Sequence, residues 1–250
     1  KKEKQDLATV NNEIFLLSID IKARLRTAAS ERFMTFHSEI TRLLRNELQR
    51  EFPNWKQNLK DITETFSTWF NKALERELDR VSREEGPKLA EFVSKADAVF
   101  SRVVRAFQDR LSREIEKALQ VSFSGAKFEA DTQKPSRPDV RLSRVFDTPF
   151  ELLWFLIPMS IFRPIVLRCF MNIVPWETEK NLHRIAGQWS NALNESIDGL
   201  SRQAGEFILN EINTVENLLS VPDSRKEEIQ KAIYELDGLQ STFAPERDLS

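Results

Sequence analysis

The side chains that most often carry out catalysis are sparse in this sequence and stand far apart. It contains two histidines, His37 and His183, and each lies alone in a long helical pattern. Metal binding and acid–base catalysis need histidines, cysteines and carboxylates to converge. The acid pairs at 84–85 and 227–228 fall near predicted helix ends, where the helix dipole accounts for them. No Gly-x-x-x-x-Gly-Lys-Ser/Thr motif for cradling phosphate occurs. We therefore expect no catalytic, cofactor-binding or metal-binding residue in this chain.

A second kind of chemistry, contact with lipid, is indicated by an apolar stretch at 150–174 with basic residues beside it. Its segment 152–162 carries no charge. A transmembrane helix needs about 20 consecutive apolar residues. Two arginines interrupt this stretch, and Pro158 and Pro164 are expected to break any regular helix through it. The stretch is therefore too short and too broken to span a bilayer, yet too apolar for an ordinary surface loop.

Two interpretations of this stretch stay open: an apolar tip that enters one leaflet of a membrane, or a plug buried in a helical core. Membrane contact predicts that large apolar side chains enter the lipid and that basic side chains bind headgroups. The predicted lipid-binding residues are Phe150, Leu152, Leu153, Trp154, Phe155, Leu156, Ile157, Met159, Ile161, Phe162, Ile165, Val166, Leu167 and Phe170. The predicted headgroup-binding residues are Lys134, Arg137, Arg141, Arg144, Arg163 and Arg168.

The composition is typical of long helices rather than of a compact α/β enzyme. The chain has 37 basic and 39 acidic residues, and its net charge of −2 gives no general attraction to nucleic acid. Glycine, which turns and ligand sites need, occurs only 6 times. Cys169 is the only cysteine, so an intrachain disulfide is excluded, and a reduced thiol suits the cytosol.

Apolar residues recur at spacings of three and four along most of the chain, which is the pattern of amphipathic helices. The first run, 7–52, predicts one helix of about 45 residues that ends at a proline. The second and third runs, 55–81 and 89–119, are separated by a Gly-Pro pair at 86–87. Both remain possible: two helices, or one long kinked helix.

The second half of the chain predicts a loop, the apolar stretch and two further helices. Residues 123–147 are loop-like. The Pro-Trp-Glu sequence at 175–177 predicts the start of a fourth long helix that ends before Pro222. A capping box at 224–227 then predicts a short last helix. No alternation typical of strands is present.

Together these patterns predict an all-α fold: an elongated antiparallel bundle of long helices with an apolar tip. If successive helices alternate in direction, the apolar stretch lies at the end of the rod that the first helix reaches. The predicted organisation is a long helical stalk of residues 1–121, a loop and membrane-binding tip of residues 122–175, and return helices of the stalk in residues 176–250.

This arrangement resembles the helical stalk of a bacterial dynamin-like protein. The likeness rests on residues 150–161, on Phe162-Arg163-Pro164, and on the sequence Val-Pro-Trp-Glu-Thr-Glu-Lys-Asn-Leu at 174–182. In that family the tip, called the paddle, binds lipid, and the stalk links it to a GTPase domain. The resemblance implies a membrane-binding stalk that takes part in membrane remodelling, fusion or fission. It also implies a peripheral location at the cytoplasmic side of the inner membrane. Self-association is indicated separately, by the leucine-rich stripes and the exposed ridges expected of a long rod.

The resemblance further implies a GTPase domain in the same protein, upstream of Lys1, with GTP and magnesium bound only there. The chain begins inside a charged helical pattern without an initiator Met, so we expect it to be a fragment of a larger protein. The alternative is a soluble helical scaffold or protein-interaction module whose apolar stretch is buried in the bundle or in a partner groove.

Overall fold

The computed structural model describes residues 2–55, 58–119, 127–131, 135, 138, 140–141 and 159–220. Within this part of the chain the elements are helices, and no strand occurs. The helices are α1 (Lys2–Met34), α2 (His37–Glu51), the short 3-10 helix η1 (Phe52–Asn54), α3 (Leu59–Leu119) and α4 (Met159–Ser220). The predicted all-α bundle of long helices is therefore confirmed. The predicted last helix, at 224–239, lies outside the described residues.

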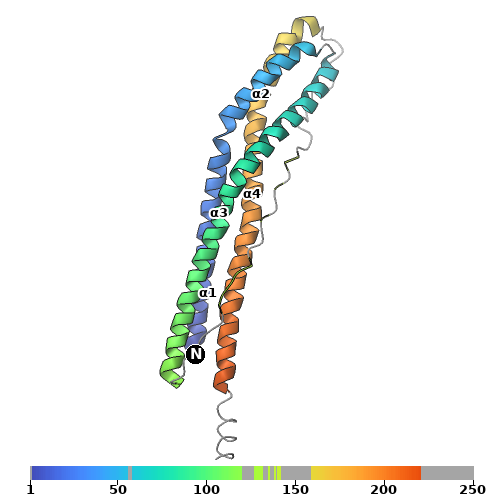
Figure 1. Cartoon of the computed structure of the whole chain (residues 1–250). Helices are drawn as coiled ribbons and strands as arrows, with labels where there is room; N and C mark the ends of the chain where they lie inside the picture. Colours follow the sequence, from blue (N-terminus) through green and yellow to red (C-terminus); the bar gives the residue numbers. More distant parts are fainter. Residues whose placement is uncertain are drawn as a thin grey trace, which may run out of the picture.

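The bundle has three long rods, formed by α1 with α2, by α3 and by α4 (Figure 1). The first rod runs antiparallel to α4, because Lys22 bonds to Asp198 at one level and Arg45 bonds to Met171 at another. Helices α3 and α4 run parallel, since Trp189 bonds to Ser82 and contacts between the two helices continue in register toward their C-terminal ends.

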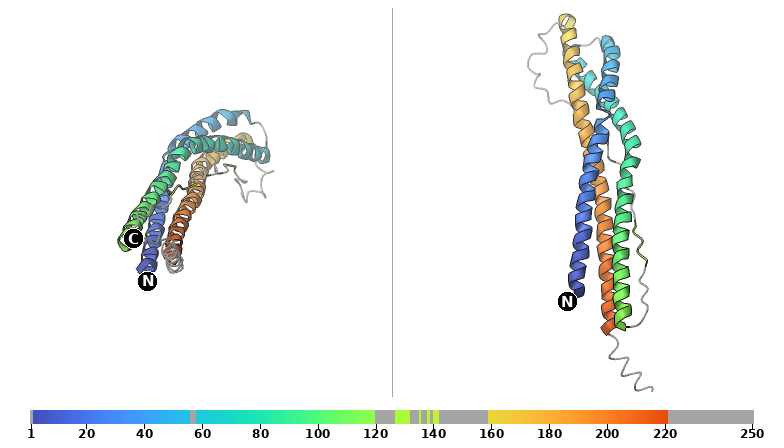
Figure 2. Two further views of the ribbon diagram at one scale, coloured as in Figure 1. Left: turned by 60° about the horizontal axis from the view of Figure 1, so that its bottom comes forward. Right: turned by 90° about the vertical axis from the view of Figure 1, so that its left-hand side faces the viewer.

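Parallel α3 and α4 contradict the expectation that successive helices alternate in direction. The chain returns along the bundle between them: Asp131 exchanges hydrogen bonds with Gln203, and Arg184 donates to the carbonyl of Val140. Helix α4 therefore begins at the end of the rod where α2 finishes, which the right-hand view of Figure 2 also shows. This is the end predicted for the apolar stretch, reached by a different path.

The rod is much longer than a compact protein of this size. Helices α3 and α4 have 61 and 62 residues, and each is about 90 Å long at a rise of about 1.5 Å per residue. A compact globular chain of 250 residues has a radius of gyration of about 18 Å. Its longest dimension would therefore be well below the length of these helices. The left-hand view of Figure 2 shows that the rod bends toward the end where α2 meets α3.

The first predicted helix is divided in two. Helix α1 ends at Met34 and α2 begins at His37, with a turn at Thr35 and Phe36. The hydroxyl of Thr35 donates to the carbonyl of Arg32 at 2.6 Å, and threonine hydroxyls compete in this way with the regular backbone ladder. The prediction of a single helix over 7–52 was wrong because hydrophobic spacing does not register such a local competition.

Prolines inside the helices account for the other differences. The Gly-Pro pair at 86–87 lies within α3, so the second and third runs form one helix. Pro164 and Pro175 both lie within α4. The predicted break at Pro164 and the predicted helix start at Pro175 were therefore wrong.

Side chains of α2 replace the hydrogen bonding that a proline removes from α4. Pro175 has no N–H to give to the carbonyl of Met171, four residues earlier. Arg45 Nε donates to this carbonyl at 2.9 Å. Two turns of α2 away, His37 Nε2 lies 3.1 Å from the carbonyl oxygen of Pro175, and because a carbonyl only accepts, this ring nitrogen carries the hydrogen.

Candidate functional site

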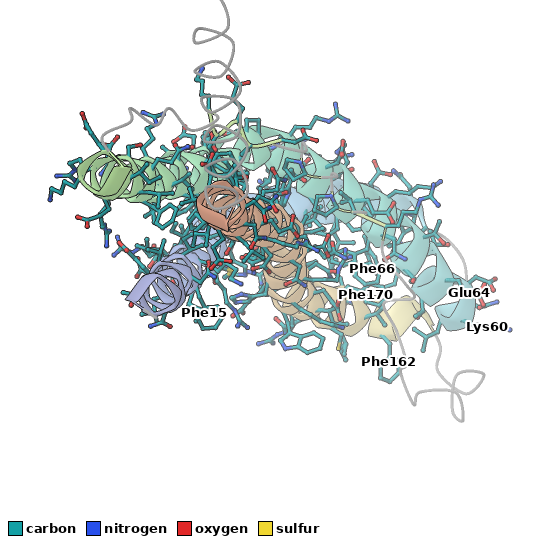
Figure 3. All side chains as sticks on the ribbon, turned by 90° about the horizontal axis from the view of Figure 1, so that it is seen from below. Phe15, Lys60, Glu64, Phe66, Phe162 and Phe170 are labelled. Atoms are coloured by element: carbon teal, nitrogen blue, oxygen red, sulfur yellow. The ribbon has the colours of Figure 1, made fainter. Side chains whose placement is uncertain are left out.

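Aromatic rings fill the bundle where α2 ends and α4 begins. We call these rings the corner cluster: Phe52, Trp55, Phe66, Trp69, Phe70 and Phe170. The rings of Phe66 and Phe170 stack with centroids 3.9 Å apart, and Phe52 meets Phe170 edge-on at 6.2 Å. Figure 3 shows Phe66 and Phe170 side by side inside this end of the rod. The cluster fastens η1, α3 and α4 to one another.

Arg163 ties the first turns of α4 to the end of α2. Its Nη2 donates to the carbonyl of Phe52 at 2.8 Å and to that of Pro53 at 3.3 Å. The guanidinium also lies 5.1 Å from the centroid of the Phe52 ring, a cation–π distance. A cation at the last carbonyls of a helix is favoured by the helix dipole.

These contacts turn two of the predicted lipid-contacting residues toward the bundle, where Phe170 is buried and Arg163 is half-buried. Phe170 is only 6% exposed, and the guanidinium of Arg163 is bonded to backbone carbonyls. Both side chains hold the end of the bundle together. This arrangement favours a structural role for both side chains.

The remaining predicted site residues fall into three groups. Phe150, Leu152 to Ile157, Lys134, Arg137 and Arg144 lie outside the described residues, and the backbones of Met159 and Ile161 form the first turn of α4. Phe162, Val166 and Leu167 are half-buried at the start of α4. Ile165 and Arg168 are exposed there, and Arg141 is exposed in the segment that runs beside α4. The structure therefore brings part of the predicted set to one end of the rod.

An exposed face of α4 extends the predicted set. We call it the α4 outer face: Ile165, Cys169, Asn172 and Trp176, all exposed. Their spacing of four, three and four residues places them on one side of a helix. Sequence reasoning missed Trp176 because the proline before it predicts a helix start. The same spacing rule, carried through the proline, would have found it.

Two of the buried carboxylates, Glu77 and Glu85 of α3, are held by ion pairs. Glu85 is 4% exposed and pairs with Arg32 at 3.2 Å and Lys88 at 2.6 Å. The hydrogen bond to Glu85 raises the pKa of Lys88, which stays charged at neutral pH. Glu77 pairs in the same way with Arg80. The pair between Glu85 and Arg32 links α3 to α1.

A second exposed apolar surface lies on α1, near the other end of the rod. Phe15, Leu16 and Ile19 are 59%, 56% and 45% exposed. Figure 3 shows Phe15 on the outer side of α1. Soluble monomers seldom keep large contiguous apolar patches uncovered, so this α1 outer face is a candidate for contact with another protein surface.

The described residues offer little to a small ligand or metal ion. They contain no group of three or more histidines, cysteines and carboxylates arranged to hold a metal. A hollow of about 70 Å³ between α3 and α4, beside Phe107 and Ile212, is smaller than typical ligand pockets, which measure about 300 Å³ or more. A second hollow, of about 490 Å³, lies beside Arg76, Arg80 and Arg83 of α3, and it is open to solvent and lined by charged side chains. No helix among the described residues is long and apolar enough to cross a membrane.

Comparison of the chain with protein-family models, with curated proteins and with solved structures finds no match. The case for function therefore rests on the residues and on their arrangement.

Proposed function

We propose that this chain is the membrane-binding helical stalk of a dynamin-like GTPase, which holds a lipid-binding apolar segment at one end of a rod and takes part in membrane remodelling, fusion or fission. One observation carries the proposal. In the sequence the uncharged apolar residues 152–157 come just before α4, and from Met159 to Trp176 this helix contains two arginines and no acidic residue. Exposed apolar side chains beside basic ones are the pattern of a helix at a lipid interface.

Apolar burial and attraction to anionic lipid together would provide enough free energy for this end of the rod to bind a bilayer. Removing apolar surface from water contributes about 25 cal/mol per Å², and each basic residue near an anionic surface contributes about 1 kcal/mol. Several large side chains of the segment 150–157, together with exposed Ile165 and Arg168, would hold the rod on a bilayer. The corner cluster and Arg163 would keep the end of the rod rigid while the segment enters one leaflet.

In this proposal the helical bundle transmits movement from a GTPase domain to the membrane. A GTPase domain upstream of Lys1, carrying GTP and magnesium, would move the stalk, and the rod would transmit that movement about 90 Å to the lipid. The protein would be peripheral, at the cytoplasmic side of the inner membrane.

Co-sedimentation with liposomes tests the proposal. Trp154→Asp, Phe155→Asp and Phe162→Ala, combined, should abolish sedimentation with vesicles that contain anionic lipid while the helical circular dichroism stays unchanged. A matched control is Leu209→Asp, which adds charge at an exposed apolar position near the far end of α4 and should sediment normally. Unchanged sedimentation of the triple variant would contradict the proposal.

The second candidate function is a helical scaffold that binds a second copy of the chain. The α1 outer face favours it, because Leu16, Ile19 and Ala23 are exposed at spacings of three and four residues. This spacing is that of the seam between two helices in a coiled coil. Self-association is compatible with the lipid-binding proposal, and the two make separate predictions.

A further inference from the structure

The α4 outer face points directly away from the rest of the bundle. Ile165, Cys169, Asn172 and Trp176 lie within about three turns, over about 17 Å of the helix axis. The opposite side of the same turns packs inward, where the ring of Phe170 stacks in the corner cluster. The face is therefore open to contact by a surface that approaches the rod from the side.

Charge selects the kind of surface that this face fits. Arg168 is exposed at its edge, and Lys180 is exposed one turn beyond its end. No acidic residue occurs between Met159 and Trp176. Glu177 is buried and paired with Lys180 at 3.5 Å, and Glu179, the first exposed acidic residue of α4, lies beyond Trp176. The face complements an anionic partner.

The apolar side chains select the chemistry of that partner. Trp176 is 62% exposed, and Lys180 Nζ lies 5.0 Å from the centroid of its ring. Tryptophan concentrates where headgroups meet acyl chains, and lysine stems beside it extend along the apolar surface with their charge in water. Ile165, 56% exposed, supplies a second apolar contact two residues after Arg163. This combination fits a lipid surface.

We propose that the α4 outer face binds anionic lipid headgroups, so that the rod lies against the membrane along the first turns of α4 as well as inserting its apolar segment. This inference rests on the proposed function, because it specifies how the lipid-bound rod is oriented. A rod held at two places, the segment before Met159 and the face that ends at Trp176, has a fixed angle to the bilayer. A rod held by the segment alone would pivot.

The single cysteine makes the inference testable in the intact chain. Cys169 lies on the face and is exposed, so it accepts a solvent-sensitive NBD fluorophore. On vesicles of phosphatidylcholine and phosphatidylglycerol, the emission should shift to the blue, and lipids spin-labelled near the headgroup should quench it. The matched control is Cys169→Ser with Asn191→Cys, which moves the label to an exposed position farther along α4. Its emission should stay unchanged.

Co-sedimentation of the same labelled samples separates the two proposals. If the protein sediments with vesicles while the label at Cys169 stays in water, the inference is overturned and the proposed function stands. If the protein does not sediment with vesicles, the proposed function and the inference are both contradicted. As a second variant, Arg168→Gln should weaken vesicle binding about fivefold, the equivalent of one basic residue near an anionic surface. Unchanged affinity of this variant would also contradict the inference.

Discussion

At position 86 of α3 the absence of a β-carbon makes room for the indole of Trp189. A β-carbon there would lie 2.5 Å from Cζ2 of the ring. The ring is nearly buried, and its Nε1 donates to Ser82 at 2.9 Å, so it has little freedom to move aside. Gly86 therefore fixes how closely α3 and α4 approach in the middle of the rod.

We predict that Gly86→Ala destabilises the protein even though alanine is the better helix former. Alanine gains about 1 kcal/mol of helix propensity over glycine, but overpacking typically costs about 1 to 3 kcal/mol. A displaced indole would also lose its hydrogen bond to Ser82, worth about 1 kcal/mol. The expected net loss is about 1 to 3 kcal/mol in the free energy of unfolding, measured by urea denaturation.

Gly187 provides the control for this prediction. It lies in α4, and a β-carbon added there would meet no side chain and no other helix within 4 Å. Gly187→Ala should therefore stabilise the protein by about 0.5 to 1 kcal/mol. A Gly86→Ala variant as stable as Gly187→Ala would show that the indole of Trp189 is not confined as described.

At the scale of the elements, α4 continues through Pro175 because another helix supplies what the proline lacks. The hydrogen bond from Arg45 to the carbonyl of Met171 takes the place of the missing backbone N–H. Buried carbonyls without a partner are costly, so the continuous course of α4 depends on the packing of α2 against it. The two helices are energetically coupled at this point.

A double-mutant cycle between Arg45 and Pro175 measures that coupling. Arg45→Met should cost about 1 to 2 kcal/mol in the wild-type background, because the carbonyl of Met171 loses its partner. In a Pro175→Ala background the restored N–H bonds to that carbonyl, and the same change should cost little. A coupling energy of about 1 kcal/mol in thermal or urea unfolding is expected.

Exposed Arg42, one turn from Arg45 on the same helix, gives the comparison. Arg42→Met should change stability by less than about 0.5 kcal/mol in either background. Equal costs of Arg45→Met with and without Pro175 would mean that the hydrogen bond does not support the helix.

At the scale of the whole molecule, the two exposed apolar surfaces lie toward opposite ends of a rod about 90 Å long. The α4 outer face is flanked by basic residues and follows the apolar segment. The α1 outer face is flanked by charges of both signs, since Glu13, Asp20 and Arg24 are exposed around it. This difference favours lipid for the first surface and a second copy of the chain for the other.

We predict that the chain self-associates through the α1 outer face. Analytical ultracentrifugation should show a dimer or larger species, and Leu16→Glu with Ile19→Glu should sediment as a monomer with unchanged helicity, because the charges oppose burial of the seam. Trp176→Glu, which alters the other exposed surface, should leave the oligomeric state as it is. A wild-type chain that stays monomeric at every concentration tested would rule out this interface.

The sequence by itself determined the all-α class and the apolar stripe of each helix. These follow from local spacing, since residues three and four apart share a helix face whatever lies beside them. The sequence placed the apolar stretch only through an assumed alternation of helix directions, which the parallel course of α3 and α4 contradicts. It did not determine that Phe170 and Arg163 face inward, because which side of that stretch meets α2 and α3 is decided by packing.

The tertiary structure decided what happens at the prolines and where the chain turns back. A proline removes one hydrogen bond, and local reasoning predicts the end of a helix there. Arg45, 126 residues before Met171 in the sequence, supplies that bond only when the bundle is assembled. The parallel course of α3 and α4 also depends on contacts between residues distant in sequence. Asp131 and Val140, in the segment that joins the two helices, form hydrogen bonds with side chains of α4. Contacts between residues so distant in sequence leave no periodic pattern, and they are what positions the candidate surface.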